Sequence, residues 1–300
     1  MKIYIPKINE SWIVDRFRDE WYKNNPNMST KNIFLADVIW IMSPWMWKKV
    51  PKYFLKTKKV VCTYHHIVNS KFNKNDFESL DHYVDNYHVI SSKTQSQVRE
   101  LTKKNIFNHP FWVNHNLWFP LDEKDKLRKS FGFQKEQYLI GSFQRDTESH
   151  DLKSPKLEKG PDILFSIISE INKKRKNLTV VLTGKNRQYI IDKLKENDIK
   201  YKYFEMLDLE SINKLYNILD LYIVSSRVEG GPQAILECAA SKTPIISRDV
   251  GIASEVLNTK SLFDQDFSKA APDIEYAYNS VKELFIPKGM DKFIKMFDKI

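Results

Sequence analysis

The stretch LYIVSSRVEGGPQAILECAASKTPII, residues 221–246, decides the fold of this chain. It opens with an apolar, partly β-branched run, which predicts a short buried strand that ends in the polar turn SSR. Gly230-Gly231 then permits a tight turn, and Pro232 suits the first position of a helix whose alanines and aliphatic side chains form an apolar face. A second strand is expected at 242–246. Together these elements predict a βαβ unit of a parallel sheet.

The glycine turn is a candidate anion site. Backbone N–H groups at a helix N-terminus lack intrahelical partners, and the helix dipole favours a negative ligand such as phosphate. Two carboxylates flank the turn, Glu229 before the glycines and Glu237 within the helix. Because ligands of open α/β sheets bind at the carboxyl ends of the strands, we expect both acids to border one crevice, where one meets sugar hydroxyls and the other a ribose. The alternative is two solvated glutamates on an ordinary βαβ unit.

The same residues carry a family resemblance. Glu229 to Glu237, followed by Pro244-Ile245-Ile246 and Gly251, resembles the E-x7-E signature of the retaining, GT-B-fold glycosyltransferases of family 4 (group 1). The resemblance implies an α/β protein with two Rossmann-like domains whose parallel sheets face an interdomain cleft. It also implies glycan biosynthesis, in which a hexose-type sugar passes from a nucleotide diphosphate sugar to a carbohydrate or lipid-linked acceptor with retention of configuration. The match covers the second half of the chain well and the first half loosely.

Strand and helix patterns alternate along the chain, which predicts parallel sheets covered on both faces. In the first half we expect strands at 2–5, 36–42, 59–64 and 87–90 and helices at 10–23, 77–83 and 92–104. In the second half we expect strands at 138–143, 178–182, 200–204 and 261–263 and helices at 123–129, 161–174, 189–197, 209–219 and 274–284. The first helix is amphipathic, with Trp12, Phe17 and Trp21 on its inner face.

The chain is expected to divide into an acceptor-side domain, residues 1–119, and a nucleotide-sugar-binding domain, residues 120–285. The segment 108–120 is rich in aromatic residues, proline and asparagine, and we interpret it as the last strand and hinge of the first domain. Residues 286–300 contain a last amphipathic helix, and the family resemblance implies that this helix packs back towards the first domain.

Composition excludes several classes of protein. The chain is 42% hydrophobic, enough to bury the cores of two domains. Cys62 and Cys238 lie far apart, so a disulfide framework or zinc site has no support and a reducing cytoplasm is expected. The N-terminus lacks a long apolar core, and the most apolar later stretch, 33–47, is interrupted by Asp37 and Pro44. We therefore predict no membrane-spanning segment and no export signal.

Positive charge is concentrated in the first half. Residues 1–119 hold 18 Lys and Arg against 10 Asp and Glu, a net charge of +8 within the total of +10. Six lysines fall between Lys48 and Lys59, and on a helix Lys48, Lys52, Lys56 and Lys59 lie roughly on one side, although Pro51 must start a new turn. Such a face predicts contact with anionic lipid and a peripheral position on the inner face of a membrane. A solvated lysine face over a packed core is the alternative.

Glycosyl transfer builds negative charge on the leaving diphosphate, which fixed cations stabilise. By resemblance, Arg145 in GSFQRD and Lys159 in KLEKGPD correspond to the arginine and lysine-glycine pair that grips the diphosphate. The loop between them is longer than is usual in the family, and Lys153 or Lys156 could replace Lys159. Surface charges on a long loop are the other interpretation.

The resemblance also assigns roles to the acids of the turn. Glu229 would contact the hydroxyls of the transferred sugar and help to stabilise its cationic transition state, while Glu237 would accept hydrogen bonds from the ribose. The backbone N–H groups of Gly230 and Gly231, with Pro232 closing the turn, would hold the distal phosphate.

One residue of the first half joins this set. His65 ends the run VVCTYH, which resembles the family strand whose terminal histidine reaches the donor sugar, with His66 as the fallback. A histidine that only makes structural hydrogen bonds is the alternative. The family's early Gly-Gly loop is missing and is replaced by residues 6–10, which leaves acceptor placement near this loop open.

No metal cofactor is expected. Asp264-Gln265-Asp266 spells a D-x-D motif, but it follows the last strand of the domain and lies far from the glutamate turn in sequence. Cations and a helix terminus can do a divalent ion's work.

Three other functions stay open: a nucleotide-sugar epimerase or hydrolase on the same fold, a DNA-directed glycosyltransferase, and a basic nucleic-acid-binding protein. Nucleic acid is disfavoured because the basic residues are mostly lysines and the aromatic residues fall on predicted core faces. The base, the sugar and the acceptor depend on side chains that the sequence does not place.

Overall fold

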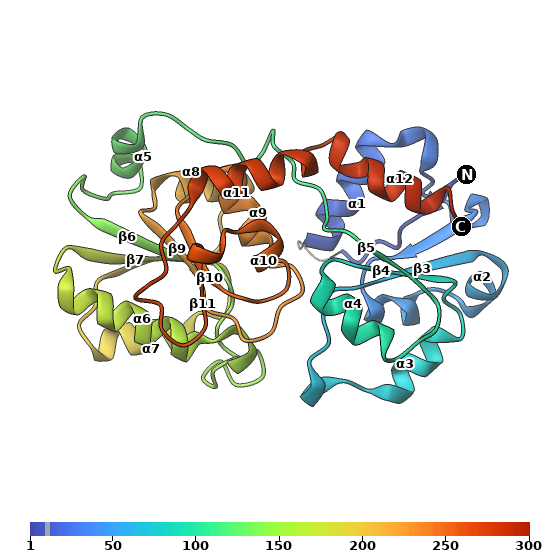
Figure 1. Ribbon diagram of the computed structural model, residues 1–300, viewed down its shortest axis with the longest axis horizontal. Helices are drawn as coiled ribbons and strands as arrows, with labels where there is room; N and C mark the ends of the chain where they lie inside the picture. Colours follow the sequence, from blue (N-terminus) through green and yellow to red (C-terminus); the bar gives the residue numbers. More distant parts are fainter. Residues whose placement is uncertain (10–12) are drawn as a thin grey trace. The chain divides into compact units, whose positions relative to one another are not determined.

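The computed structural model describes residues 1–9 and 13–300. Glu10 and Trp12, which we assigned to the first helix, lie outside the described residues. The chain forms two compact units, Met1–Trp112 with Pro287–Ile300, and Val113–Ile286. Each unit contains one parallel sheet covered by helices (Figure 1). The predicted α/β class with two Rossmann-like parallel sheets is therefore confirmed.

The sheet of the first unit has five parallel strands in the order β1-β2-β3-β4-β5. Their bounds are β1 Ile3–Tyr4, β2 Val38–Ile41, β3 Lys59–Tyr64, β4 Asn86–Val89 and β5 Asn105–Asn108. A parallel bridge between Ile3 and Ser29 extends the sheet beyond β1. The chain thus runs outward from β1 to Ser29 and then returns past β1 to β2, and this reversal lets its helices cover both faces.

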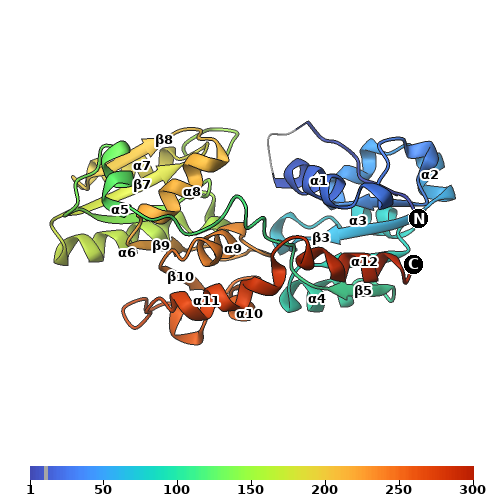
Figure 2. The same cartoon turned by 90° about the horizontal axis from the view of Figure 1, so that it is seen from above.

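Helices α1 (Ile13–Asn24) and α12 (Asp291–Phe297) cover one face of this sheet, and α3 (Lys74–Asp81) and α4 (Ser92–Arg99) cover the other (Figures 1 and 2). The ring of Phe293, in α12, lies 5.3 Å from that of Trp40 and 5.0 Å from that of Trp112. Residues 287–300 therefore complete the core of the first unit. The first segment of this unit ends at Trp112, whose ring belongs to this aromatic cluster. The sequence had placed the boundary after Phe119.

The sheet of the second unit has six parallel strands in the order β11-β10-β9-β6-β7-β8. Their bounds are β6 Tyr138–Ser142, β7 Leu178–Thr183, β8 Tyr201–Phe204, β9 Leu221–Val224, β10 Ile245–Arg248 and β11 Leu262–Phe263. The chain runs from β6 through β7 to β8 and then crosses back to β9 on the other side of β6. The topological switch point therefore lies between β6 and β9, where open α/β sheets bind ligands.

Two hydrophobic cores flank this second sheet. Residues of α6 (Pro161–Lys174) and α7 (Gln188–Glu196) pack on one face. Residues of α8 (Leu209–Ile218), α9 (Gln233–Ala240), α10 (Ala253–Val256) and α11 (Ile274–Val281) pack on the other, and α5 (Lys124–Ser130) precedes the first strand. The apolar faces predicted from the helical periodicity are the ones that are buried.

Three predicted elements of the first unit were wrong in extent, and one of them is the helix expected at 77–83, which is α3, Lys74–Asp81. Helix α4 ends at Arg99 rather than Lys104, because Leu101 and Thr102 both donate to the carbonyl of Val98 in a turn that leads into β5. The last strand is β5, Asn105–Asn108, rather than part of 108–120.

The expected single lysine face on residues 48–59 is also wrong. Lys48 ends a 3₁₀ helix, Pro44–Lys49, whereas Lys52 and Lys56 belong to α2, Lys52–Thr57, and Lys59 opens β3. Pro51 caps α2 and separates it from the 3₁₀ helix, so the lysines do not share one helix.

In the described part of the chain, no helix is both long and apolar enough to span a bilayer.

Candidate functional site

Two loops leave the sheet at the switch point of the second unit. Residues 143–160 follow β6, and residues 225–232 follow β9. These strands are neighbours, since Ile140 pairs with Leu221 and Gly141 with Tyr222. The carboxyl ends of β6 and β9 therefore bring the two loops together, although their residues lie far apart in the sequence.

An ion pair joins the loops. The Nζ of Lys159 contacts Oε1 of Glu229. The hydroxyl of Ser226 lies 3.2 Å from the same carboxylate oxygen and 2.9 Å from Oε1 of Gln144. The side chains of Lys159 and Glu229 are only 21% and 11% exposed, so water screens this pair less than a surface pair.

Polar side chains that the sequence analysis missed hold the pair in place. Nε2 of Gln144 donates to the carbonyl of Lys159 at 2.8 Å, and the hydroxyl of Ser225 donates to the same carbonyl at 3.2 Å. Gln144 thus bonds to the backbone of Lys159 and Ser226 bonds to Glu229, and the two side chains bond to each other across the loops. Their only signals in the sequence were position, since Gln144 precedes Arg145 and Ser225-Ser226 directly follow a buried strand.

Two glycines outside the turn determine its shape. Gly160 has φ +60°, and a Cβ on it would lie 2.0 Å from the carbonyl oxygen of Ser225. Gly251 has φ +51°, and its Cβ would lie 1.9 Å from the carbonyl oxygen of Gly230. The backbones of Gly230 and Gly231 are not in the left-handed region of φ, whereas those of Gly160 and Gly251 are. The positions whose backbone conformation favours glycine are therefore Gly160 and Gly251.

Helix α9 begins at Gln233, and Pro232 is its N-cap residue with φ −55°. The helix therefore starts one residue later than the sequence predicted. The turn and the start of α9 still lie together after β9.

Glu237 lies inside α9 and is 8% exposed. Its Oε2 accepts a 2.9 Å hydrogen bond from the hydroxyl of Tyr216, in α8. Burial, reinforced by the nearby Glu237, raises the pKa of Tyr216 well above its usual value, so this hydroxyl remains a donor. The Tyr216 ring lies 5.0 Å from that of Phe143, which opens the loop after β6. Through Tyr216 and Phe143, Glu237 is thus connected to the loop after β6, which Glu229 also contacts through Lys159.

Arg145 is half-buried in the loop after β6, and its neighbour Asp146 anchors that loop. The buried Arg187 donates through Nε to Oδ2 of Asp146 at 2.5 Å. The backbone N–H of Asp146 donates to Asn186, and its carbonyl accepts from Lys156. The loop position next to Arg145 is therefore rigidly held.

Of the three loop lysines considered, Lys159 is the one whose amino group reaches the glutamate turn. Lys156 instead pairs with Glu158 at 2.9 Å and Glu148 at 3.4 Å, and Lys153 is exposed.

His65 belongs to the first unit, and its imidazole ring is fixed by a hydrogen bond and a stacking contact. Its Nε2 lies 2.7 Å from the carbonyl oxygen of Met42, which requires the proton on Nε2, and its ring stacks on Phe111 at 5.9 Å. His66 follows it at the carboxyl end of β3.

Within residues 1–9 and 13–300, no group of three or more His, Cys, Asp or Glu side chains is arranged to hold a metal ion. Asp264 of the D-x-D sequence pairs with Arg248 at 2.7 Å, and Asp266 caps the backbone N–H of Ser268. Cys62 and Cys238 are free and buried, and burial raises the pKa of both thiols.

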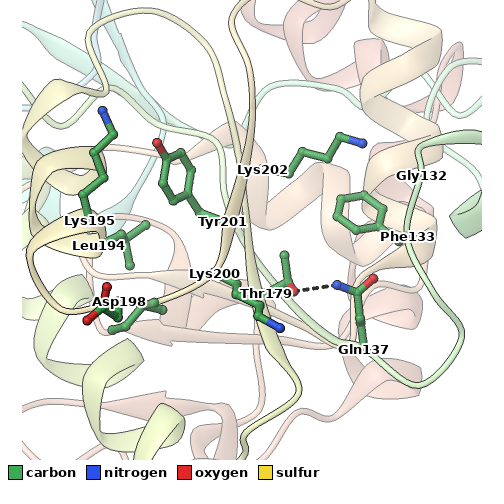
Figure 3. A pocket seen from close by; sticks show the side chains of 11 residues that line it. Gly132, Phe133, Gln137, Thr179, Leu194, Lys195, Asp198, Lys200, Tyr201 and Lys202 are labelled. Carbon is green, nitrogen blue, oxygen red and sulfur yellow. Dashed lines mark hydrogen bonds between the residues drawn. The ribbon is translucent and has the colours of Figure 1, made fainter.

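A separate hollow of about 590 Å³ lies at the amino ends of β7 and β8. Lys195, Lys200 and Lys202 line it, but Figure 3 shows their amino groups pointing in different directions. Lys202 also donates to the carbonyl of Phe131 at 2.5 Å. These three lysines therefore do not converge on one anion.

A family model described as "Glycosyl transferases group 1" matches residues 124–284. The matched residues lie within the second unit and include both loops of the switch point. Among curated proteins, none matches the chain significantly.

Solved structures resemble the whole chain. HepE (Alr3699) of Anabaena, in complex with UDP and glucose, matches with a TM-score of 0.79 at 12% identity over 100% of this chain and 99% of HepE. Sucrose-phosphate synthase of Thermosynechococcus elongatus matches with a TM-score of 0.70 at 14% identity over 95% and 77% of the two chains. A glycosyltransferase of Rickettsia africae matches at 0.69 and 15% identity over 99% and 97%. At these identities the likeness concerns the fold, which is the GT-B architecture.

Proposed function

Because the chain belongs to the group 1 glycosyl transferases, we propose that it moves a hexose-type sugar from a nucleotide diphosphate sugar to a carbohydrate or lipid-linked acceptor, with retention of configuration. The observation that supports this most directly is the contact of Lys159 with Glu229 at the switch point. A cation and an acid, held side by side where α/β sheets bind ligands, match the two opposite charges of glycosyl transfer.

The diphosphate would be held by Lys159, Arg145 and the start of α9. Lys159 sits on a loop fixed by Gln144, and Arg145 precedes the anchored Asp146, so neither cation needs to be reorganised when the leaving group gains charge. The backbone N–H groups of Gly230 and Gly231 would bind the distal phosphate.

The two acids would recognise the sugars of the donor. Glu229 would contact the transferred hexose and stabilise the positive charge that develops on its anomeric carbon. Glu237 would accept hydrogen bonds from the ribose while Tyr216 holds its other oxygen. His65 is proposed to meet the donor sugar from the first unit, with its orientation fixed by the bond to Met42.

UDP is the first nucleotide to test, because the HepE structures contain UDP, UDP-glucose or UDP with glucose. A thermal-shift screen with UDP, GDP, ADP and their sugars should raise the melting temperature with one nucleotide family, since a ligand of the native state stabilises it. Proton NMR of the product from the active donor should show the anomeric configuration of that donor. The absence of a shift with every nucleotide, or an inverted product, contradicts the proposal.

The epimerase and hydrolase alternatives make a different prediction. Such enzymes release an epimer or free sugar at full rate without an acceptor, whereas a transferase consumes the donor much faster when its acceptor is present. Donor consumption measured with and without a cell-derived glycan fraction separates them.

An anionic membrane surface is proposed as a further partner of the first unit. The most exposed large apolar side chains of the described residues are Phe34 (71%), Tyr53 (69%) and Leu35 (66%), and the exposed Lys52 and Lys56 lie in the same helix as Tyr53. Aromatic and aliphatic side chains beside lysines suit a lipid interface.

Sedimentation with vesicles tests this surface. Vesicles with phosphatidylglycerol should bind the chain, and purely zwitterionic vesicles should not. The substitutions Lys52→Glu and Lys56→Glu should abolish binding, whereas Lys173→Glu and Lys176→Glu in the second unit make the same charge change as a control. Equal binding to both vesicle types, or to neither, removes the proposal.

A further inference from the structure

The first unit contains a hollow of about 530 Å³ at the carboxyl ends of β2 and β3. Ser43 and Pro44, which follow β2, and residues 64–68, which end and follow β3, form its inner wall. Small-molecule sites are commonly about 300–1,000 Å³ in volume and occupy this end of a parallel sheet. The position and size of the hollow are therefore those of a ligand site, and His65 lies in its wall.

Aromatic side chains dominate the lining. Trp45 is 45% exposed, although a large apolar ring is usually buried, and Lys49 holds one side of it with its amino group 4.9 Å from the ring centroid. Trp47 and Phe72 line the same hollow, and both are half-buried. Exposed aromatic faces at a concave site offer a flat apolar platform to a ligand that is itself partly polar.

The polar side chains of the wall include an ion pair of Lys48 and Asp76, which together carry no net charge. Nζ of Lys48 lies 2.8 and 2.9 Å from the two carboxylate oxygens of Asp76. The backbone N–H of Asp76 is held at 3.0 Å by the side chain of Asn73. Lys48 and Asp76 together can donate to and accept from hydroxyl groups. Among the described lining residues, Lys71 is the one other charged side chain, and it is exposed on the rim.

This composition selects between ligand classes. A hydrocarbon chain would remove water from the Lys48–Asp76 pair without replacing its hydrogen bonds. An anion would have to displace the Asp76 carboxylate, both of whose oxygens contact Lys48. A neutral sugar has an apolar ring face for Trp45 and hydroxyls for the ion pair, so it satisfies both parts of the wall.

We propose that this hollow binds a neutral hexose unit at the end of the acceptor, an inference that rests on the proposed transferase function. The same platform explains why Trp45 remains exposed. The hollow lies wholly within the first unit, so its occupancy can be measured separately from nucleotide binding.

Saturation-transfer NMR on the full chain with UDP tests the proposal, using methyl glucoside, methyl galactoside, methyl mannoside and methyl glucuronide as probes. At least one neutral hexoside should receive saturation, mainly at its ring C–H protons, and more than the glucuronide. Trp45→Ala should weaken this signal roughly threefold or more, the loss of one aromatic contact. Tyr276→Ala, which removes an aromatic ring of similar exposure (47%) from α11 of the second unit, should leave it unchanged.

The UDP signals in the same samples report on the second unit and on folding. UDP saturation with no hexoside signal, a stronger glucuronide signal, or equal hexoside signals from wild type and the Trp45 variant would each overturn the acceptor-site assignment alone. If UDP receives no saturation, and neither GDP nor ADP does in its place, the proposed transferase function fails, and with it the interpretation of any bound hexoside as an acceptor.

Discussion

The amino group of Lys159 contacts the carboxylate of Glu229 across two loops that leave neighbouring strands, β6 and β9. The hydroxyl of Ser226 and the amide of Gln144 connect the same two loops. The proposed function gives these opposite charges separable roles, in which Lys159 would act on the leaving diphosphate and Glu229 would act on the sugar.

Substitution of the acid should affect turnover more than binding. For Glu229→Gln we expect kcat to fall on the order of 100-fold, since a group that stabilises the transition-state charge is lost, while the Kd for UDP changes by less than about threefold. Steady-state kinetics and UDP titration measure the two effects. Wild-type turnover in this variant contradicts the role of Glu229.

Substitution of the cation, Lys159, should affect UDP binding more than turnover. Lys159→Met should raise the Kd for UDP by about tenfold or more, the typical loss of a hydrogen bond to a charged group. Lys153→Met removes an exposed lysine from the same loop and should leave the Kd within about twofold of wild type, as surface charges contribute little. Equal effects of the two variants would show that Lys159 has no special contact with the diphosphate.

The close approach of Gly251 to the glutamate turn predicts a steric effect. Gly251→Ala places a Cβ 1.9 Å from the carbonyl oxygen of Gly230, so the turn must move and UDP binding should be lost. Gly184→Ala is the matched control, because φ there is +89° and the nearest atom to its Cβ is 3.6 Å away. The control should lose only about 1–2 kcal/mol of unfolding free energy for the left-handed backbone. Isothermal titration with UDP and urea unfolding distinguish the two, and UDP binding by the Gly251 variant contradicts the steric argument.

The buried pair of Asp146 and Arg187 should position Arg145. Asp146→Asn leaves the guanidinium buried beside a neutral amide and should cost about 3–5 kcal/mol of unfolding free energy. The KM for the donor should rise in the same variant, because the anchor next to Arg145 is weakened. The double variant Asp146→Asn with Arg187→Met should recover part of the lost stability in urea unfolding. Simple addition of the two single effects would show that the pair is not coupled.

Buried histidines in the first unit predict acid sensitivity. His88 bonds through Nδ1 to Thr63 at 3.0 Å and through Nε2 to the carbonyl of His109 at 2.9 Å. Burial, followed by the charge of His109, lowers the pKa of His88 well below its usual value. Burial, followed by the charge of Lys292, lowers the pKa of His109 to about 4.

Both histidines are therefore neutral in the folded protein, whereas an unfolded imidazole binds a proton near pH 6.5. Their stabilising contribution is complete above that pH and is lost as the pH falls towards 4, by about 3 kcal/mol for His109. Urea unfolding at pH 7.5, 6.0 and 4.5 should show this decline, and His109→Gln should flatten it. A slope that is unchanged in the variant would assign the acid sensitivity to other groups.

Local pattern predicted the central motif well. The alternation of apolar residues and the GGP turn placed β9, α9 and β10 within a few residues of their bounds, because side-chain periodicity and backbone freedom are properties of neighbouring residues. The same kind of pattern misled at residues 48–59, where Pro51 separated two helices and Asp76, distant in sequence, took Lys48 as its partner.

From the sequence alone, this protein is an alternation of strands and helices with an acid-glycine turn at a strand end, since those features depend only on nearby residues. Only the tertiary structure placed Lys159, rather than Lys153 or Lys156, against Glu229, brought Gln144 to Ser226, and set Gly251 against Gly230. These contacts depend on which strands are neighbours in the sheet. β6 and β9 become neighbours only because the chain crosses back over the sheet after β8.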